Sequence, residues 1–338
     1  MHNTKLKLGR TNIEVTEMSF GAAPIGNIFR TISEEDSRAM VDLAWDSGIR
    51  CYDTAPMYGH GLSEARIGES LRWKNRDEYT LVSKVGRVLH PAKRNEIDFT
   101  PWVDGLPFKM EFDYSYDGVM RAFEDSNLRL GLEHIDVAFI HDIDVFTHGE
   151  DQQKIHFKNA MDGAYKALEN LRSNGHVSAI GVGVNEAEVC FDALKHGDFD
   201  GFLLAGRYTL LEQDALDDFL PLCEQRNAFV LVGGGFNSGI LATGAVEGAK
   251  YNYAPAPDDI MKRVVGIEQV CKEFNVPLPA AALQFVVAHP AVPSFIAGVR
   301  NTEQLQGNID CMNIDIPSQL WQTLKDKGLL RKDAPTPA

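Results

Sequence analysis

Several features that direct a chain to other protein classes are scarce or missing here. Among 338 residues there are five cysteines, an odd number, and no pair has CxxC spacing. We therefore expect reduced, mostly buried thiols rather than a disulfide framework or zinc ribbon. No apolar run approaches the roughly 18 residues that cross a bilayer, and the N-terminal MHNTKLKLGR lacks the apolar core of a signal peptide. These absences predict a cytoplasmic protein without a membrane partner.

Positive charge is also scarce. The 48 acidic residues outnumber the 33 lysines and arginines, which gives a formal net charge of −15. Nucleic acids and anionic membranes attract proteins through a positive face, so we expect neither as a partner. A small anionic cofactor depends on its local pocket, and the net charge does not argue against one.

The remaining pattern alternates short apolar runs with amphipathic segments. Near-continuous apolar runs are typical of strands buried on both faces of a parallel sheet. Eight predicted strands cover residues 18–23, 49–55, 79–85, 136–142, 178–184, 201–206, 228–234 and 294–299. Predicted helices cover residues 33–48, 63–72, 115–131, 159–175, 185–197, 212–227, 257–275, 302–312 and 317–328. This order predicts an α/β fold, either a (β/α)8 barrel or a doubly wound sheet.

The positions of the glycine-rich segments favour the barrel. A dinucleotide-binding sheet places GxGxxG directly after its first strand, but the segment here is GAAPIG at 21–26. The run GGGFNSG at 233–239 follows the seventh predicted strand, where barrels often bind phosphate. We therefore predict one TIM-barrel domain over residues 1–338, with extra C-terminal helices and an N-terminal hairpin at 7–17. The long segment 86–114 is expected to be a lid or binding loop.

Four polar residues fall at or just after the carboxyl ends of successive predicted strands. Asp53 and Tyr58 follow the second strand, Lys84 ends the third, and His141 ends the fourth. Strand ends of a barrel meet at one rim, so these side chains are expected to share a pocket. A lysine inside the apolar run LVSKV needs a partner, and Asp53 is the candidate.

This set suits the interconversion of an alcohol and a carbonyl. A nearby ammonium favours a phenolate, so Lys84 is expected to lower the pKa of Tyr58 from its ordinary value of about 10. Tyr58 then exchanges a proton with the reacting oxygen, and His141 donates a hydrogen bond to it or positions the substrate. A nicotinamide would supply or accept the hydride.

Other interpretations stay open. Asp53 can cap a turn, Tyr58 can pack with its hydroxyl bonded, and His141 can be a core histidine. A non-catalytic, cofactor-binding subunit on the same fold is a further alternative, because fold does not fix function.

A metal-dependent hydrolase is also an alternative. The run HDIDVFTHGEDQQKIH contains His141, Asp142, Asp144, His148 and His156. It lies in one segment without an HxH or HExxH pattern, so we expect a solvated polar loop and no metal site.

The same residues carry a resemblance to a known family. The segments CYDTAPMYGHGLSEARIGESL, LVSKVG and FIHD resemble the aldo-keto reductase family, whose D-x-A-x-x-Y-G pattern matches Asp53, Ala55, Tyr58 and Gly59. The resemblance runs from about residue 7 to about residue 311. It implies a (β/α)8 barrel and a catalytic set of Asp53, Tyr58, Lys84 and His141.

The resemblance also implies a nicotinamide cofactor. The implied cofactor-binding positions are Gly21, Asp53, Asn185, Arg207, Tyr208, Asn237, Ser238, Gly239, Leu241, Gly298, Arg300, Gln304 and Asn308. Tyr208 is expected to stack on the nicotinamide, and the backbone amides of 237–239 are expected to bind the pyrophosphate. Gln304 stands where many NADPH users have a basic residue, which favours NAD. Arg300 keeps NADP possible.

Two positions depart from the family. Gly183 stands where a serine often helps to hold the carboxamide, and Arg207 stands where a glutamine is usual. Asn185 is then the nearby amide for the carboxamide.

Within the family the chain resembles the sugar 1-dehydrogenases, and pyridoxal 4-dehydrogenase is similar too. The implied reaction is oxidation at C1 of an aldose of the L-fucose, D-threo-aldose or L-galactose type to the lactone, in class EC 1.1.1.-. Oxidation of pyridoxal to 4-pyridoxolactone and general aldehyde or ketone reduction are alternatives. Besides Tyr58 and His141, the expected substrate-pocket residues are Met57, Trp102, Phe108 and Phe20. The particular substrate and the oligomeric state stay undetermined.

Overall fold

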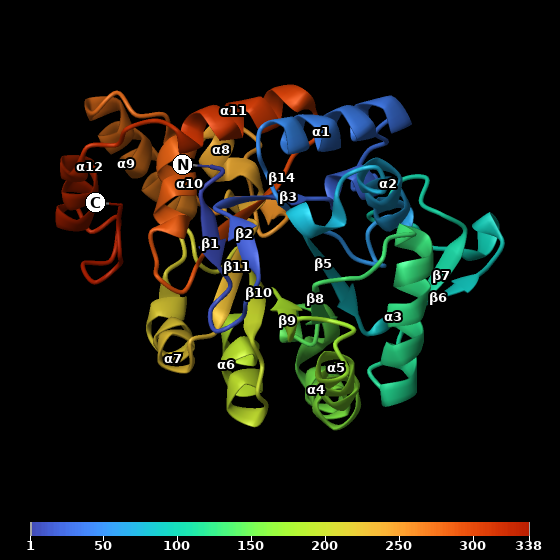
Figure 1. The fold of residues 1–338 in the computed structure, drawn as a ribbon. Coiled ribbons are helices and arrows are strands. Elements are labelled where there is room, and N and C mark those ends of the chain that lie inside the picture. The colour runs from blue at the N-terminus through green and yellow to red at the C-terminus, as the bar shows by residue number, and fades with distance from the viewer. Residues whose placement is uncertain (1, 338) are drawn as a thin grey trace.

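The computed structural model describes residues 2–337 and contains a closed parallel barrel (Figure 1). The strands pair in the order β10-β11-β14-β3-β4-β5-β8-β9. Their bounds are β3 Met18–Gly21, β4 Cys51–Asp53, β5 Thr80–Val85, β8 Val137–His141, β9 Ala179–Val184, β10 Gly201–Ala205, β11 Phe229–Gly233 and β14 Ser294–Gly298. Each strand lies inside one of the predicted strand segments, so the (β/α)8 barrel is confirmed.

The barrel strands are buried on both faces because the core has two layers. Side chains such as Val82, Phe139 and Leu231 belong to an inner cluster, whereas Tyr52 and Ile140 pack against the surrounding helices. Successive side chains of a strand point to opposite faces, and both faces are apolar here. This explains the near-continuous apolar runs in the sequence.

The helices surround the barrel (Figure 1). Their bounds are α1 Glu34–Asp46, α2 Leu62–Leu71, α3 Tyr116–Leu130, α4 Val145–Asn159, α5 Tyr165–Ser173, α6 Ala187–His196, α7 Phe219–Arg226, α8 Ile240–Thr243, α9 Asp258–Glu273, α10 Leu278–Val287, α11 Thr302–Met312 and α12 Ser318–Asp326. Ser33 caps α1 and Ser115 caps α3 through side-chain bonds to backbone amides. In the part of the chain that the structure describes, no helix has the length and apolar character needed to cross a membrane.

Helices α4, α8 and α10 differ from the prediction. The run after His141 was expected to be a solvated polar loop, but α4 begins at Val145, and Asp144 caps it by accepting a hydrogen bond from the amide of Thr147 at 3.0 Å. A five-residue π-helical stretch at 160–164 joins α4 to α5. Helix α10 was missed because its residues are almost all apolar and buried, so the sequence shows no amphipathic period.

The predicted N-terminal hairpin is present. Strands β1 Lys5–Lys7 and β2 Glu14–Thr16 pair antiparallel, close to the predicted 7–17. Leu8 and Val15 of this hairpin join the inner cluster of the barrel. The hairpin therefore closes the amino-terminal end of the barrel, and the carboxyl-terminal end remains for a site.

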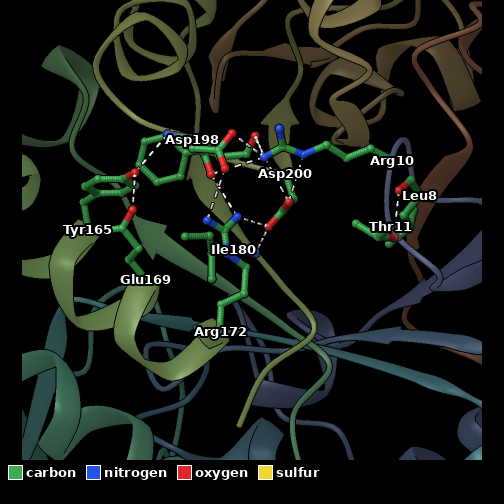
Figure 2. Close-up of polar contacts among 10 residues, drawn as sticks. Leu8, Arg10, Thr11, Tyr165, Glu169, Arg172, Ile180, Asp198 and Asp200 are labelled. Atoms are coloured by element: carbon green, nitrogen blue, oxygen red, sulfur yellow. Dashed lines mark hydrogen bonds and ion pairs between the residues drawn. The ribbon is translucent and has the colours of Figure 1, made fainter. Parts of the chain in front are cut away.

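A charged network fixes the hairpin to that closed end (Figure 2). Arg10 pairs with Asp198 at 2.6 Å and with Asp200 at 3.2 Å, and Arg172 pairs with Asp200 at 2.6 Å. Asp200 also accepts a hydrogen bond from the amide of Ile180 at 3.0 Å. These contacts join three segments that lie far apart in the sequence, so we attribute a structural role to them.

The segment 86–114 is partly ordered as a hairpin. Strands β6 Arg87–Pro91 and β7 Phe108–Phe112 pair antiparallel and project beside α3 (Figure 1). Between them the chain returns to the barrel rim, where Trp102 forms an isolated bridge with Ile28. A second short hairpin, β12 Lys250–Tyr251 and β13 Ala254–Pro255, follows α8.

Candidate active site

Asp53 and Lys84 form a buried ion pair at the carboxyl end of the barrel. Asp53 ends β4, Lys84 lies near the end of the neighbouring β5, and Lys84 Nζ is 2.7 Å from Asp53 Oδ1. Nζ also donates to the carbonyl oxygen of Thr54 at 2.8 Å, and the Lys84 side chain is only 1% exposed. Burial raises the pKa of Asp53, while the charge and hydrogen bond of Lys84 oppose that rise. The predicted partnership of these two residues is present.

Tyr58 lies against this pair on the loop after β4. Lys84 Nζ is 4.8 Å from the centre of the Tyr58 ring, and the ring of His141 is 6.0 Å away, edge to face. The indole of Trp102 packs on Tyr58 at 5.5 Å. No group within residues 2–337 forms a hydrogen bond with the Tyr58 hydroxyl, so this hydroxyl is available to a substrate. The alternative in which Tyr58 packs with its hydroxyl bonded is therefore wrong.

The expected lowering of the Tyr58 pKa is wrong for the protein without ligands. Burial raises this pKa well above 10, and the charges of Asp53 and Asp142 raise it further, with Arg87 opposing them. Asp53 lies against the ammonium of Lys84 and largely cancels its field at the phenol. Tyr58 is therefore a protonated phenol at neutral pH.

His141 completes the set from the end of β8. Burial lowers its pKa well below 6.5, and the cations of Arg87 and Lys84 lower it further. The imidazole is therefore neutral at physiological pH. A neutral imidazole can donate a hydrogen bond to a reacting oxygen without supplying a proton itself.

The expected substrate-pocket residues differ in how close they lie to Tyr58. Trp102 covers Tyr58, and Met57 is partly exposed beside it in the chain. Phe108 lies on β7, where its carbonyl accepts a hydrogen bond from His60 Nδ1 at 2.7 Å. Phe20 as a pocket residue is wrong, because its side chain is fully buried in the outer core layer against Tyr52.

An aromatic pair across the barrel mouth was not predicted. Phe29, from the segment after β3, and Tyr253, from the β12–β13 turn, have ring centres 6.4 Å apart. Both side chains are more than half exposed, and both residues have a φ of 64°. The amide of Tyr253 donates to Ser238 Oγ at 3.0 Å, which ties this turn to the glycine-rich segment. No periodic pattern predicts a contact between loops so far apart in the sequence.

The expected stacking role of Tyr208 is wrong. Its side chain is fully buried, and its ring packs on Phe285 of α10 at 5.2 Å and on His289 at 5.5 Å. The ring faces the helices, so it presents no surface to a cofactor at the barrel mouth. Leu241 is fully buried as well, and its amide donates to Phe236 O at 3.1 Å, so it is also removed from the cofactor set.

The rim near β9 and β10 holds Asn185 and Arg207. Arg207 Nε donates to the carbonyl of Asn185 at 2.9 Å, and its Nη1 donates to Asn252 Oδ1 at 3.0 Å. Asn185 Nδ2 donates to Asp144 Oδ2 at 3.1 Å. The Oδ1 of Asn185 receives no hydrogen bond from the described residues, which leaves it as an acceptor for a carboxamide.

The glycine-rich segment after β11 offers fewer donors than expected. The amides of Asn237 and Gly239 are used inside the segment, by Gly234 O at 2.8 Å and Phe236 O at 3.0 Å. The Asn237 side chain is also occupied, because it donates to Gly206 O at 3.1 Å and accepts from Thr209 Oγ1 at 2.6 Å. The prediction that all three backbone amides of 237–239 bind the pyrophosphate is therefore wrong. Ser238 remains the candidate donor in this segment.

The segment after β14 fits the adenosine end of a dinucleotide. Helix α11 begins after Asn301, whose side chain caps it, and its N-terminal end attracts an anion. Arg300 and Gln304 are exposed there, joined by a bond from the Arg300 amide to Gln304 Oε1 at 2.9 Å. Arg30, not predicted, donates to the Arg300 carbonyl at 3.4 Å. Two guanidinium groups therefore lie at this end.

Three further predicted cofactor positions flank that segment. Gly298 ends β14 with an exposed backbone, and Asn308 is partly exposed on α11. Gly21 ends the adjacent β3, where a β-carbon would come within 2.9 Å of Ile296 Cγ2. This arrangement of open strand ends, amides and cations fits a nicotinamide dinucleotide along the rim.

The polar run after His141 forms no metal centre in residues 2–337. Asp144 caps α4, and Asp142 is paired with Arg87 at 2.6 Å. The rings of His148 and His156 stack at 3.9 Å. The five cysteines are free thiols.

Comparisons with known proteins agree on one family. The model of the aldo/keto reductase family matches residues 17–328. Pyridoxal 4-dehydrogenase of Microbacterium luteolum is 42% identical over 339 residues, covering 96% of this chain and 98% of that protein. D-threo-aldose 1-dehydrogenase of a Pseudomonas species is 36% identical over 345 residues, covering 100% of both chains. The holo structure of an aldo-keto reductase from Bacillus halodurans has a TM-score of 0.76 at 22% identity, covering 98% of this chain and 97% of its own, which supports the fold.

Proposed function

The chain belongs to the aldo/keto reductase family of oxidoreductases, and on that premise we propose that it oxidises a cyclic hemiacetal to its lactone with a nicotinamide cofactor. The observation that carries the proposal is the free hydroxyl of Tyr58 beside the buried Asp53–Lys84 pair and the neutral His141. This set can move one proton at the reacting oxygen, and a nicotinamide, when bound, would supply the hydride acceptor.

Each side chain has a distinct part in the proposed reaction. Tyr58 Oη takes the hydroxyl proton of the hemiacetal in oxidation and returns it in reduction. Lys84 stabilises the phenolate that this requires, and Asp53 holds the ammonium charged and in place. His141 donates a hydrogen bond to the same oxygen and so fixes its orientation.

Two substrates are compatible with this chemistry. An aldose oxidised at C1 is the first candidate, supported by the likeness to D-threo-aldose 1-dehydrogenase. Pyridoxal is the second candidate, favoured by the higher identity, 42%, to pyridoxal 4-dehydrogenase. Both compounds form cyclic hemiacetals whose oxidation gives a lactone, so one set of catalytic groups serves either.

The proposed cofactor is NAD, held at Arg300, Gln304, Gly298 and Asn308, with the pyrophosphate near Ser238. Gln304 carries no charge for a 2′-phosphate, whereas Arg300 can offer a bidentate contact. Fluorescence titration with NADH and NADPH, on the wild type and on Arg300→Ala, tests this preference. If the wild type binds NADPH more tightly than NADH, and Arg300→Ala abolishes this preference, the proposed cofactor becomes NADP.

The deciding assay is reduced-cofactor formation at 340 nm. It uses both oxidised cofactors and L-fucose, D-arabinose, L-galactose and pyridoxal. Turnover on one sugar supports the aldose reaction, and turnover on pyridoxal alone supports the second candidate. Turnover on none of them, with reduction of simple aldehydes by NAD(P)H, would make the protein a general reductase of the family.

A further inference from the structure

A second buried ion pair lies against the proposed catalytic histidine. Arg87 Nη2 is 2.6 Å from Asp142 Oδ2, and the same Oδ2 is 3.5 Å from His141 Nε2. The Arg87 side chain is 6% exposed and that of Asp142 is 11% exposed. Burying two charges this deeply is costly, and such a pair often persists for a role other than stability.

The backbone at Asp142 is constrained so that its carboxylate reaches both partners. Its φ of 53° is left-handed, a conformation that few residues other than glycine adopt. The Tyr114 hydroxyl lies 2.8 Å from the carbonyl oxygens of both His141 and Asp142, and His148 Nε2 donates to that of Asp142 at 2.8 Å. The Asp142 amide donates to Gly183 O at 2.9 Å. Both peptide groups that flank Asp142 are therefore held in place.

Arg87 reaches this site from outside the barrel. It is the first residue of β6, directly after Gly86, and its guanidinium packs over the ring of Phe112 at 4.5 Å. Its Nη1 is buried and has no hydrogen-bond partner among the described residues. A guanidinium keeps its charge in proteins, and the charge of Arg87 helps to lower the pKa of His141.

Charges from several elements face the His141 imidazole. Lys84 lies on β5, Arg87 on β6, and Asp142 follows His141 in the chain, while Tyr58 meets the ring from the loop after β4. The two cations favour the neutral imidazole, and the carboxylate favours imidazolium. Burial is the largest cause of the lowered His141 pKa, and Arg87 adds to it directly. By pairing with Asp142, Arg87 also weakens the field of the one carboxylate that lies beside the imidazole.

We propose that Arg87 and Asp142 are positioning residues for His141: Asp142 orients the imidazole, and Arg87 neutralises Asp142 so that the imidazole stays an uncharged hydrogen-bond donor. The inference rests on the proposed function, in which His141 acts on the reacting oxygen. Without Arg87, an unpaired carboxylate would stand 3.5 Å from Nε2 and would stabilise imidazolium.

The test is the titration of His141 followed by NMR, with its ring signal assigned from its loss in His141→Asn. Arg87→Met is expected to raise the His141 pKa by about one unit or more, since an unpaired carboxylate at that range shifts a pKa by about 1–3 units. Arg87→Lys keeps the charge and is expected to restore the low value. Asp142→Asn is expected to leave the imidazole neutral.

The chain offers a matched control at the closed end of the barrel. Arg76 pairs with Asp136 at 2.5 Å, is 8% exposed and also has a buried nitrogen without a partner. Arg76→Met is expected to lower stability comparably and to leave the His141 titration unchanged. An unchanged His141 titration in Arg87→Met, or an equal change in Arg76→Met, would overturn the proposal.

Kinetics supply a second readout. The pH profile of kcat/KM of Arg87→Met is expected to show the His141 ionisation at a higher pH than the profiles of the wild type and Arg76→Met do. Asp142→Asn is expected to lower kcat at least tenfold with little change in KM, because it loosens a group that acts on the reacting oxygen. If Arg87→Met does not fold, the comparison of Asp142→Asn with the wild type tests the proposal. An unchanged kcat in Asp142→Asn would refute the positioning role of Asp142. The NMR titration needs no substrate, so its result is separate from failure of the proposed function.

Discussion

Lys84 Nζ lies 2.7 Å from the Asp53 carboxylate and 4.8 Å from the centre of the Tyr58 ring, so one ammonium contacts both an anion and the phenol that it is expected to activate. The carboxylate neutralises much of the ammonium's field in the protein without ligands. A bound oxidised nicotinamide and a substrate oxygen would change that balance. The activation of Tyr58 is therefore expected to depend on the assembled complex.

Tyr58→Phe removes the proposed proton carrier and little else. The variant is expected to lose about 10²- to 10⁴-fold in kcat, the usual contribution of general acid–base catalysis. Cofactor affinity, measured by fluorescence quenching, should change less than about threefold, because the ring and its contact with Trp102 remain. A loss of kcat below tenfold would remove Tyr58 from the acid–base role.

The pH dependence of the two directions should be opposite. Burial raises the pKa of Tyr58 well above 10, so the phenolate needed for oxidation is a minor species at neutral pH. The kcat for oxidation is expected to rise with pH toward the alkaline limit of the assay, about tenfold per unit where chemistry limits the rate. Reduction should be fastest at lower pH. An oxidation rate that levels off below pH 8 would show that the substrate complex lowers this pKa strongly.

Lys84→Met leaves Asp53 as a buried charge without its partner. We expect a loss of about 3–5 kcal/mol in the free energy of unfolding, measured by denaturant titration at pH 7. The double variant Asp53→Asn with Lys84→Met removes both charges and should recover part of that loss. If Lys84→Met lowers the free energy of unfolding by less than about 1 kcal/mol, Asp53 is instead neutralised by a proton or solvated by water in that variant. Both variants should lack activity.

Acid should destabilise the protein partly through His289. Burial lowers the pKa of His289 to about 4, and the half-exposed Glu224, 3.3 Å from Nε2, is screened by water. The unfolded chain binds a proton near pH 6.5 and the folded chain does not, so this contribution is complete above pH 6.5 and is lost as pH falls toward 4. The full effect is about 3 kcal/mol.

His289→Asn serves as the test of that contribution. An asparagine oxygen can replace Nδ1 as the acceptor of the Ala291 amide, which lies 3.1 Å away. The fall in melting temperature between pH 7 and pH 5 should be smaller in this variant than in the wild type. Equal falls in the two proteins would assign the acid sensitivity to other groups.

The parts of the site that the sequence predicted are those fixed by strand ends. Asp53, Lys84 and His141 stand at the ends of apolar runs, and parallel strand order brings such ends to one rim. Two of the positions that failed depend on which way a side chain turns. Phe20 and Tyr208 are one residue from rim positions, and in both cases the side chain points to the helices.

The sequence by itself determined the fold class, because eight apolar runs of strand length in βα alternation fit only a barrel or a doubly wound sheet, and the positions of the glycine-rich segments favoured the barrel. It also predicted the four residues proposed for catalysis, three of them at strand ends and Tyr58 on the loop after β4. Only the tertiary structure decided the charge states, because desolvation and fields depend on distances that no spacing encodes. The Arg87–Asp142 pair and the Phe29–Tyr253 contact join segments distant in sequence, and their meeting depends on how the whole rim packs.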